Sequence, residues 1–424
     1  MPAGRFDAGP GDAFSLVQST RNPVPEAEAM ENHVHEWLNL AIRWIHVIVG
    51  IAWIGASFYF NWLENRLDRL GARGAGIAGE LWAVHGGGFY HLQKYEVAPP
   101  RLPETLHWFK WEAYTTWISG MALLAVVYYF NARAFVIDPA KTALSPTSAV
   151  AIGLGAIAVA WFVYDGLCRS PLKQRPVLLS AAVAVFLAAL AWALDMVLSS
   201  RAAYMHVGAA IGTIMVANVF FVIIPGQREL VAALGAGREP DPVPGRNALV
   251  RSRHNNYLTL PVVFIMISGH FPSTYGHRHG WLVLVALSLI GVAVRHYFNI
   301  RHASPRAVWI LPVSFAALVT VMVYTAPTPM SRTTTVVAPD TDIAVILRQR
   351  CTSCHAPSPT QPGFASPPAG LALDDMGAVI ANAERIYLTT VATSTMPLGN
   401  LTGMTETERA VLGMWLESKI GERR

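Results

Sequence analysis

The stretch VLLSAAVAVFLAALAWALDMVL, residues 177–198, decides the fold class of this chain. It contains a single ionisable side chain, Asp195, close to its end. A helix rises about 1.5 Å per residue, so roughly 20 apolar residues are enough to cross the hydrocarbon core of a bilayer. The stretch therefore predicts a membrane-spanning helix and places the chain among membrane proteins.

Seven further apolar segments bring the predicted spans to eight. They are 38–60, 113–131, 148–164, 203–225, 257–271, 281–298 and 308–325. Pro261 interrupts one of them, which is tolerated where neighbouring helices cover the freed backbone groups. Charged residues make up only 14% of the chain, against about 25% in soluble proteins. The excess positive charge lies in loops rather than in a basic arm, which argues against a nucleic-acid partner.

The distribution of Lys and Arg predicts the orientation of the spans. Loops after the first, third, fifth and seventh spans are rich in these residues, whereas the opposite loops hold only Arg133, Lys141, Arg201 and Arg278. Basic loops remain in the cytoplasm. Both termini are therefore predicted to lie outside it. Cys168, at the inner end of the third span, is expected to be an ordinary free thiol in a reducing compartment.

A short motif near the C-terminus, Cys351-Thr-Ser-Cys-His355, predicts a covalent haem c. Cys351 and Cys354 would form thioethers to the haem vinyl groups, and His355 would be an axial iron ligand. A zinc site would need two more ligands of similar spacing, and His355 is the last histidine in the chain. A disulfide between Cys351 and Cys354 is the remaining alternative. Haem c is attached outside the cytoplasm, which agrees with the predicted orientation.

A sixth iron ligand is expected from Met396, in the loop STMPLG between two predicted helices. His/Met ligation raises the reduction potential, which suits an electron acceptor. Met376 and Met404 compete for this role, and any of the three could instead fill the core. The segments 342–350 and 378–393 are predicted helices, and Thr405 with Glu408 forms a capping box that opens a final helix.

These observations divide the chain into four parts. Residues 1–36 are predicted to be a disordered tail, residues 37–325 a transmembrane domain, residues 326–339 a linker and residues 340–424 a cytochrome c domain. The predicted fold class is all-α, with an eight-helix transmembrane bundle followed by a small helical class I cytochrome c domain.

Ionisable residues inside a membrane are costly and are therefore candidates for function. Arg43 and His46, three positions apart on one helix face, lie about 8–12 Å below the outer end of the first span at about 1.5 Å per residue. His206 lies just inside the outer end of the fifth span. A second set lies near the inner surface: His107, Glu112, His254, Arg295 and His296. For His270 and His296, snorkelling to the membrane surface is the favoured interpretation.

Several stretches resemble the bacterial membrane-bound urate oxidase (urate hydroxylase) family from about residue 36 to the end. They are HGGGFYHLQK at 85–94, LHWFKWEAY at 106–114, NVFFVIIPGQ at 218–227, SRHNNYLTL at 252–260 and MPLGN at 396–400. The resemblance implies a urate-oxidising transmembrane domain fused to a cytochrome c. It would act in purine catabolism at the bacterial inner membrane, with the cytochrome and both termini in the periplasm.

The implied reaction removes two electrons from urate and adds water, giving 5-hydroxyisourate, with the electrons passing to the haem and on to a respiratory acceptor. Such a site needs a cation for the anionic purine and a group that takes a proton. Arg43, His46 and His206 are the predicted catalytic residues on this basis. Because haem c accepts one electron at a time, either a urate radical waits until the haem is reoxidised, or a second redox centre exists, such as a b-type haem between membrane histidines.

Two other functions remain open at this stage. The chain could be a non-catalytic, membrane-anchored cytochrome c subunit that carries electrons for a partner enzyme or a quinone-linked complex. It could also be a purine transporter with a redox tail, although no inverted repeat or pair of broken helices is evident in the sequence.

Overall fold

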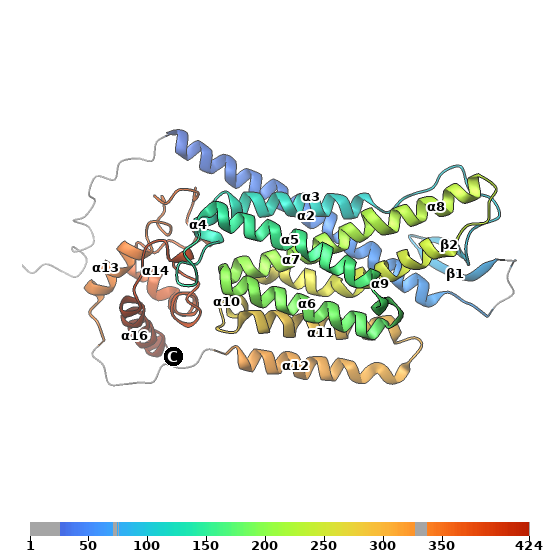
Figure 1. Ribbon diagram of the computed structural model, residues 1–424. Helices are drawn as coiled ribbons and strands as arrows, with labels where there is room; N and C mark the ends of the chain where they lie inside the picture. Colours follow the sequence, from blue (N-terminus) through green and yellow to red (C-terminus); the bar gives the residue numbers. More distant parts are fainter. Residues whose placement is uncertain (1–25, 71–73, 75, 327–336, 424) are drawn as a thin grey trace, which may run out of the picture.

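The computed structural model describes residues 26–70, 74, 76–326 and 337–423. Most of these residues are helical, and long helices run side by side to form the body of the molecule (Figure 1). The long helices of this body are α2 (Glu26–Arg66), α3 (Trp111–Leu123), α5 (Pro146–Arg169), α6 (Pro176–Val197), α7 (Ser200–Asn218), α9 (Pro242–Ser268), α11 (Gly280–Ile300) and α12 (Ile310–Tyr324).

Shorter elements extend or connect them. They are η1 (Leu124–Tyr129), α4 (Ala132–Phe135), η2 (Pro171–Gln174), η3 (Val219–Ile223), α8 (Ile224–Gly235), α10 (Pro272–Tyr275) and η4 (Pro305–Trp309). The π-helical η1 continues α3, and the π-helical η3 joins α7 to α8.

All eight predicted spans lie mainly in helical segments, but only six helices among the described residues are both long and apolar enough to cross a membrane. These are His33–Arg66, Pro146–Arg169, Pro176–Val197, Ser200–Gly235, Gly280–Ile300 and Pro305–Tyr324. The predicted spans 113–131 and 257–271 correspond to α3 with η1 and to part of α9. The described chain is therefore compatible with a membrane protein, with two fewer qualifying helices than the sequence predicted.

The N-terminal boundary also differs from the prediction. Helix α2 begins at Glu26, so residues 26–36, predicted to belong to the disordered tail, are helical. Residues 1–25 of that tail and residues 327–336 of the predicted linker lie outside the described residues.

Short polar residues and prolines set the helix starts. Ser145 accepts a hydrogen bond from the backbone of Ser148 and precedes Pro146 at the first position of α5. Asp241 does the same for α9, where Pro242 follows it. Each of these side chains accepts a hydrogen bond from a backbone N–H of the first helical turn that has no partner within the helix. The proline that follows has no backbone N–H and so leaves none unpaired.

One helix forms the centre of the bundle. In the apolar stretch of Ser200–Gly235, 61% of the residues are buried, against 6–28% in the other five membrane-length helices. Tyr204, Ile214 and Met215 of α7 are buried almost completely in the main hydrophobic core. Helices α3, α5, α6 and α9 pack around α7.

A β-hairpin corrects the all-α prediction. Strand β1 (Ile77–His85) pairs antiparallel with β2 (Gly88–Tyr95), with His85 opposite Gly88. The two connecting residues, Gly86 and Gly87, have φ values of +59° and +80°. This is the left-handed conformation that a two-residue hairpin turn requires and that glycine adopts without strain.

The C-terminal unit contains α13 (Asp340–Arg350), η5 (Pro368–Gly370), α14 (Met376–Ala381), α15 (Ala383–Ile386), η6 (Tyr387–Ala392), η7 (Leu398–Asn400) and α16 (Glu406–Arg423). The predicted helix 378–393 is thus divided among α14, α15 and η6. The capping box is confirmed, because Glu408 accepts from the backbone of Thr405 at 2.7 Å and Thr405 Oγ1 accepts from the backbone of Glu408 at 3.2 Å. Trp415 of α16 is fully buried in the core of this unit.

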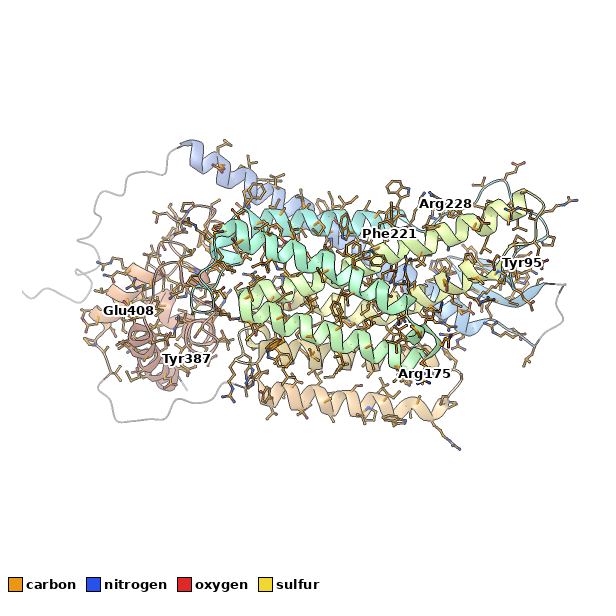
Figure 2. All side chains as sticks on the ribbon, in the orientation of Figure 1. Tyr95, Arg175, Phe221, Arg228, Tyr387 and Glu408 are labelled. Atoms are coloured by element: carbon orange, nitrogen blue, oxygen red, sulfur yellow. The ribbon has the colours of Figure 1, made fainter. Side chains whose placement is uncertain are left out.

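The two ends of the molecule differ. Figure 1 shows the C-terminal unit at one end of the long helices and the β-hairpin with α8 at the other. Arg175, Arg228 and Tyr95 lie toward the hairpin end in Figure 2, and Tyr387 and Glu408 lie at the opposite end. Loops predicted to share one side of a membrane are therefore grouped together.

Candidate functional site

The predicted haem-binding segment begins where α13 ends. The backbone N–H of Cys351 donates to Leu347 at 2.8 Å, and the backbone N–H of His355 donates to Cys351 at 2.9 Å. Nδ1 of His355 donates to the carbonyl oxygen of Leu371 at 2.8 Å, which fixes the tautomer and leaves Nε2 available as a ligand. Burial lowers the pKa of His355 and so favours the neutral, ligating form.

Both cysteines of the segment are free thiols. Burial raises the pKa of Cys351 to about 12 and also raises that of Cys354. The described residues contain no group of three or more His, Cys, Asp or Glu side chains placed to hold a metal ion, as a zinc site would need. The donors in this segment, two thiols and one imidazole, are those that a covalent haem requires.

The backbone of Met396 is held on both sides. Its N–H donates to Thr389 at 2.9 Å, and its carbonyl oxygen accepts from Nη1 of Arg409 at 2.8 Å. The competing Met404 is only 3% exposed within the core of the C-terminal unit, and Met376 packs against the same core. Met396 is not among the residues of this core, and its role as a ligand stays a prediction.

The Met396 loop lies against the end of the long helices. A Cβ at Gly399 would lie 2.9 Å from the carbonyl oxygen of Arg133 and 3.0 Å from that of Ala134, both in α4. A Cβ at Gly276, after α10, would lie 2.6 Å from Cβ of Thr393 and 2.6 Å from Cγ2 of Thr395. Backbone and side chains of the two units thus meet at close range on both sides of Met396.

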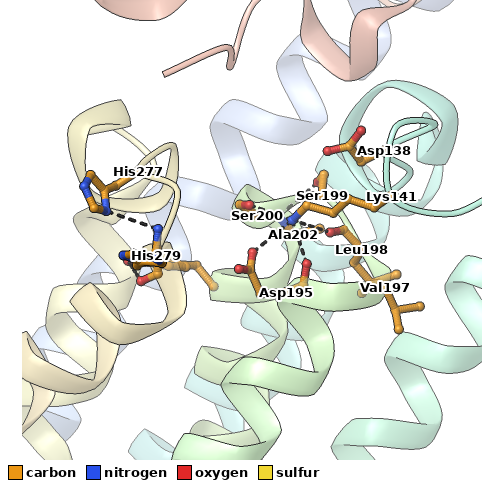
Figure 3. Close-up of polar contacts among 12 residues, drawn as sticks. Asp138, Lys141, Asp195, Val197, Leu198, Ser199, Ser200, Ala202, His277 and His279 are labelled. Carbon is orange, nitrogen blue, oxygen red and sulfur yellow. Dashed lines mark hydrogen bonds and ion pairs between the residues drawn. The ribbon is translucent and has the colours of Figure 1, made fainter. Parts of the chain in front are cut away.

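A lysine fastens the loop that follows α4 to the end of the bundle (Figure 3). Nζ of Lys141 donates to Oδ1 of Asp195 at 3.0 Å, to Oγ of Ser200 at 2.8 Å and to the carbonyl oxygen of Leu198 at 3.2 Å. Asp195 is 5% exposed. Asp195, the one ionisable residue of the stretch 177–198, is thus paired with Lys141 at this end of the bundle.

The three predicted catalytic residues lie in different surroundings. Arg43 is exposed and donates to Asn39 of its own helix. His46 donates from Nδ1 to the carbonyl oxygen of Thr116 at 3.1 Å, between α2 and α3. His206 is fully buried, donates from Nδ1 to Ala202 at 2.8 Å and accepts at Nε2 from the hydroxyl of Tyr129 at 3.0 Å.

In the described part of the chain, no hydrogen bond or ring contact joins His206 to Arg43 or His46. The structure therefore shows no direct contact that joins His206 to the other two among the described residues, and the catalytic roles of all three stay a prediction.

A second, larger cluster of polar residues joins α5, α7 and α9. Arg251 of α9 forms a 2.5 Å ion pair with Asp165 of α5 and donates to Oδ1 of Asn218 at 3.2 Å. Asn218 donates to the hydroxyl of Tyr164 at 3.0 Å and to Asn255 at 2.9 Å. The Tyr164 hydroxyl also forms a hydrogen bond with Nδ1 of His254 at 2.8 Å, which adds His254 to the cluster.

Two pairs of hydrogen-bonded residues between α9 and α11 extend this polar region toward α2. Nε of Arg295 donates to Oδ1 of Asn256 at 2.6 Å, and its guanidinium carbon lies 3.9 Å from the ring centroid of Phe58. Tyr257 bonds through its hydroxyl to Nδ1 of His296 at 2.8 Å.

A cavity of about 480 Å³ lies mainly between α6, α9 and α11. Its lining is mainly apolar, with Tyr164, His254, Tyr257 and His296 contributing polar groups. Both imidazoles bond a tyrosine hydroxyl through Nδ1, and neither Nε2 bonds any described residue. His296 thus has a defined partner beside a cavity, which the snorkelling interpretation did not include.

Comparison with protein families gives one result. A family model described as "Urate oxidase N-terminal" matches residues 32–326, which include all the long helices from α2 to α12 except the first turns of α2. The chain belongs to this urate oxidase-related family. A search of curated proteins and a search of solved structures each find no match.

The family region contains both polar regions and the cavity, whereas the haem motif lies beyond it. Sequence reasoning placed His254, Arg295 and His296 near the inner surface but assigned them no partners. It missed the roles of Tyr164, Asp165 and Asn256. The segment SRHNNY at 252–257 carried the available signal, since it places five polar side chains, from Ser252 to Asn256, directly before the predicted span 257–271.

Proposed function

We propose that the protein oxidises urate to 5-hydroxyisourate in its membrane domain and passes the electrons to a haem c in its C-terminal unit. The reaction consumes urate and water and releases two electrons and two protons. Family membership over residues 32–326 supports urate as the substrate. The observation that carries the electron route is the close packing of the Met396 loop against α4 and α10 of that same region.

Four side chains would hold the haem. Cys351 and Cys354 would supply the thioether links, and His355 and Met396 the axial ligands. The haem would supply a one-electron acceptor outside the membrane. The Leu371 carbonyl orients the imidazole, and Arg409 holds the backbone at Met396, so both ligands are preorganised.

The buried pair His206 and Tyr129 is suited to moving a proton. Nε2 of His206 accepts from the Tyr129 hydroxyl while Nδ1 donates to the backbone, so the neutral ring has one fixed acceptor. We retain His206 as a proton-handling residue, with Arg43 and His46 as predicted partners on the same outer side.

His254 and His296 are the residues we assign to a b-type haem. They line one largely apolar cavity, and each has its Nδ1 bonded to a tyrosine. Such an arrangement orients Nε2 for a metal. This group would supply a second one-electron centre, which suits a two-electron substrate. A pyridine haemochrome assay with one extractable haem for each covalent haem is expected, and a purely covalent haem content would remove this assignment.

The grouping of basic loops at the hairpin end supports insertion with that end in the cytoplasm. We therefore propose an inner-membrane protein whose C-terminal unit lies in the periplasm and delivers electrons to a respiratory acceptor.

The decisive experiment uses the purified full-length protein under nitrogen. Urate should reduce the covalent haem, with formation of 5-hydroxyisourate, whereas a variant with Cys351→Ala and Cys354→Ala should form no covalent haem and show no reduced c-type spectrum. A wild-type protein with intact haem that urate does not reduce would favour a carrier subunit for another enzyme.

A further inference from the structure

Arg295 is a buried cation for which the described chain provides no anion. Its residue exposure is 7%, and its Nε is committed to Asn256, which is 1% exposed. Across residues 26–70, 74, 76–326 and 337–423, neither Nη atom of Arg295 nor Nδ2 of Asn256 donates a hydrogen bond, and no ion pair includes Arg295.

Arg251 provides a direct comparison within the same bundle. It is 6% exposed, and it is both paired with Asp165 and bonded to Asn218. One of two equally buried arginines is therefore neutralised by the protein, and the other presents unused donors. If both arginines were purely structural, each would be expected to have a carboxylate partner.

An unpaired buried charge is expensive, and in a membrane protein it usually marks a functional site. A snorkelling arginine exposes its whole head group, whereas Arg295 is only 7% exposed as a residue. Stacking on Phe58 compensates in part but uses only the face of the guanidinium, so its edge remains available. The edge of a guanidinium is a planar, two-pronged donor that matches a planar anion.

We propose that Arg295 and Asn256 form the binding site for the urate anion. This inference rests on the proposed function and names its substrate site. Urate carries its negative charge on a flat ring whose edges alternate carbonyl oxygens and ring nitrogens. Nη1 and Nη2 of Arg295 bind one such edge, and Nδ2 of Asn256 donates to a neighbouring carbonyl oxygen. The bond from Nε of Arg295 to Asn256 holds the two groups in register.

The position of this site relates it to the cavity. Arg295 precedes His296 in α11, and Asn256 precedes Tyr257 in α9. His296 and Tyr257 line the cavity and bond each other, whereas Arg295 and Asn256 do not line it, so the proposed anion site lies beside the cavity and not within it. The outer residues Arg43, His46 and His206 then act at a distance from the purine rather than hold it.

The test is equilibrium binding of radiolabelled urate to the full-length protein, with the haem already reduced by ascorbate under nitrogen so that no turnover occurs. Arg295→Ala should weaken binding roughly 10- to 100-fold, the range expected for hydrogen bonds to a charged group. Arg295→Lys should retain part of the affinity. Arg253→Ala, an exposed arginine on α9, is the matched control and should bind as wild type does.

Asn256→Asp provides the sharper variant. It places a carboxylate beside Arg295, which should supply the missing counterion, leave the melting temperature unchanged or higher, and abolish urate binding. Urate should raise the melting temperature of the wild type and not that of Asn256→Asp. If Arg295→Ala fails to fold, the comparison of wild type with Asn256→Asp and the affinity of Arg295→Lys still test the inference.

Unchanged urate affinity in Arg295→Lys and Asn256→Asp overturns the inference, as does equal protection by inorganic phosphate, which would indicate a general anion site. These failures are separable from failure of the proposed function. Wild-type haem reduction by urate with Arg295-independent binding refutes only the site, whereas Arg295-dependent binding without haem reduction refutes the electron route.

Discussion

Replacing Gly153 with alanine should force His206 out of its position. A Cβ at Gly153 would lie 2.2 Å from Nε2 and 2.6 Å from Cδ2 of that imidazole. Since non-bonded carbon contacts lie near about 3.5 Å, the ring must move by about 1.3 Å, the difference between 3.5 and 2.2. A shift of this size breaks at least one of the bonds to Tyr129 (3.0 Å) and Ala202 (2.8 Å).

The expected cost follows from these contacts. Overpacking costs about 1–3 kcal/mol, and a buried ring nitrogen left without a partner costs about 1–3 kcal/mol more. Replacing a helical glycine by alanine returns about 1 kcal/mol. The net destabilisation is therefore about 1–5 kcal/mol.

Gly155 supplies the matched control, because a Cβ there meets nothing within 4 Å. Gly155→Ala should leave the melting temperature of the detergent-solubilised protein unchanged or slightly raised, whereas Gly153→Ala should lower it. Equal melting temperatures for the two variants would refute the placement of His206 against α5. Urate turnover is the second measurement: if His206 handles a proton, only Gly153→Ala slows it.

Three further outcomes are expected. Gly276→Ala should slow electron delivery from urate to haem c while leaving the haem spectrum intact, since its methyl group would collide with Thr393 and Thr395 across the contact between the two units. Met396→Ala should lower the midpoint potential of haem c in a redox titration, because a thioether ligand raises it. The bonds from Thr405 and Arg350 lower the pKa of Glu408 below its usual 4.5, so its contribution to stability is complete above about pH 4.5 and disappears as the pH falls through the lowered value. The melting-temperature difference between wild type and Glu408→Gln should shrink accordingly under acid.

Each of these has its own control. Gly55→Ala, at a helical glycine with open space around it, should leave electron delivery unchanged; equal slowing in both glycine variants would argue against a docking effect. Met404→Leu changes a core methionine and should preserve the potential. A potential that falls in Met404→Leu but not in Met396→Ala would reverse the ligand assignment. A wild-type advantage over Glu408→Gln that does not shrink at all as the pH falls below 4.5 would contradict the linkage argument.

Much of the architecture was determined by the sequence alone. The length and apolar character of residues 177–198 predict α6 to within a residue at each end, because these properties are local. The capping box at Thr405 and Glu408 is also local, since its partners are three residues apart. The two adjacent glycines at 86 and 87 are typical of a hairpin turn, although they lie in a segment that the sequence predicts as a loop between membrane spans.

The tertiary structure decided which polar groups meet. Asp165 and Arg251 are 86 positions apart, and Tyr129 and His206 are 77 apart. Helices that are apolar over most of their surface give little indication of which face turns inward, so their rotation and neighbours cannot be inferred from periodicity. Arg251 and Arg295 have similar surroundings in the sequence, and only the packing of α5, α9 and α11 gives one a carboxylate and leaves the other with open donors. The physical reason is that a buried charge is neutralised by whatever the fold brings to it, and that depends on contacts between segments far apart in the chain.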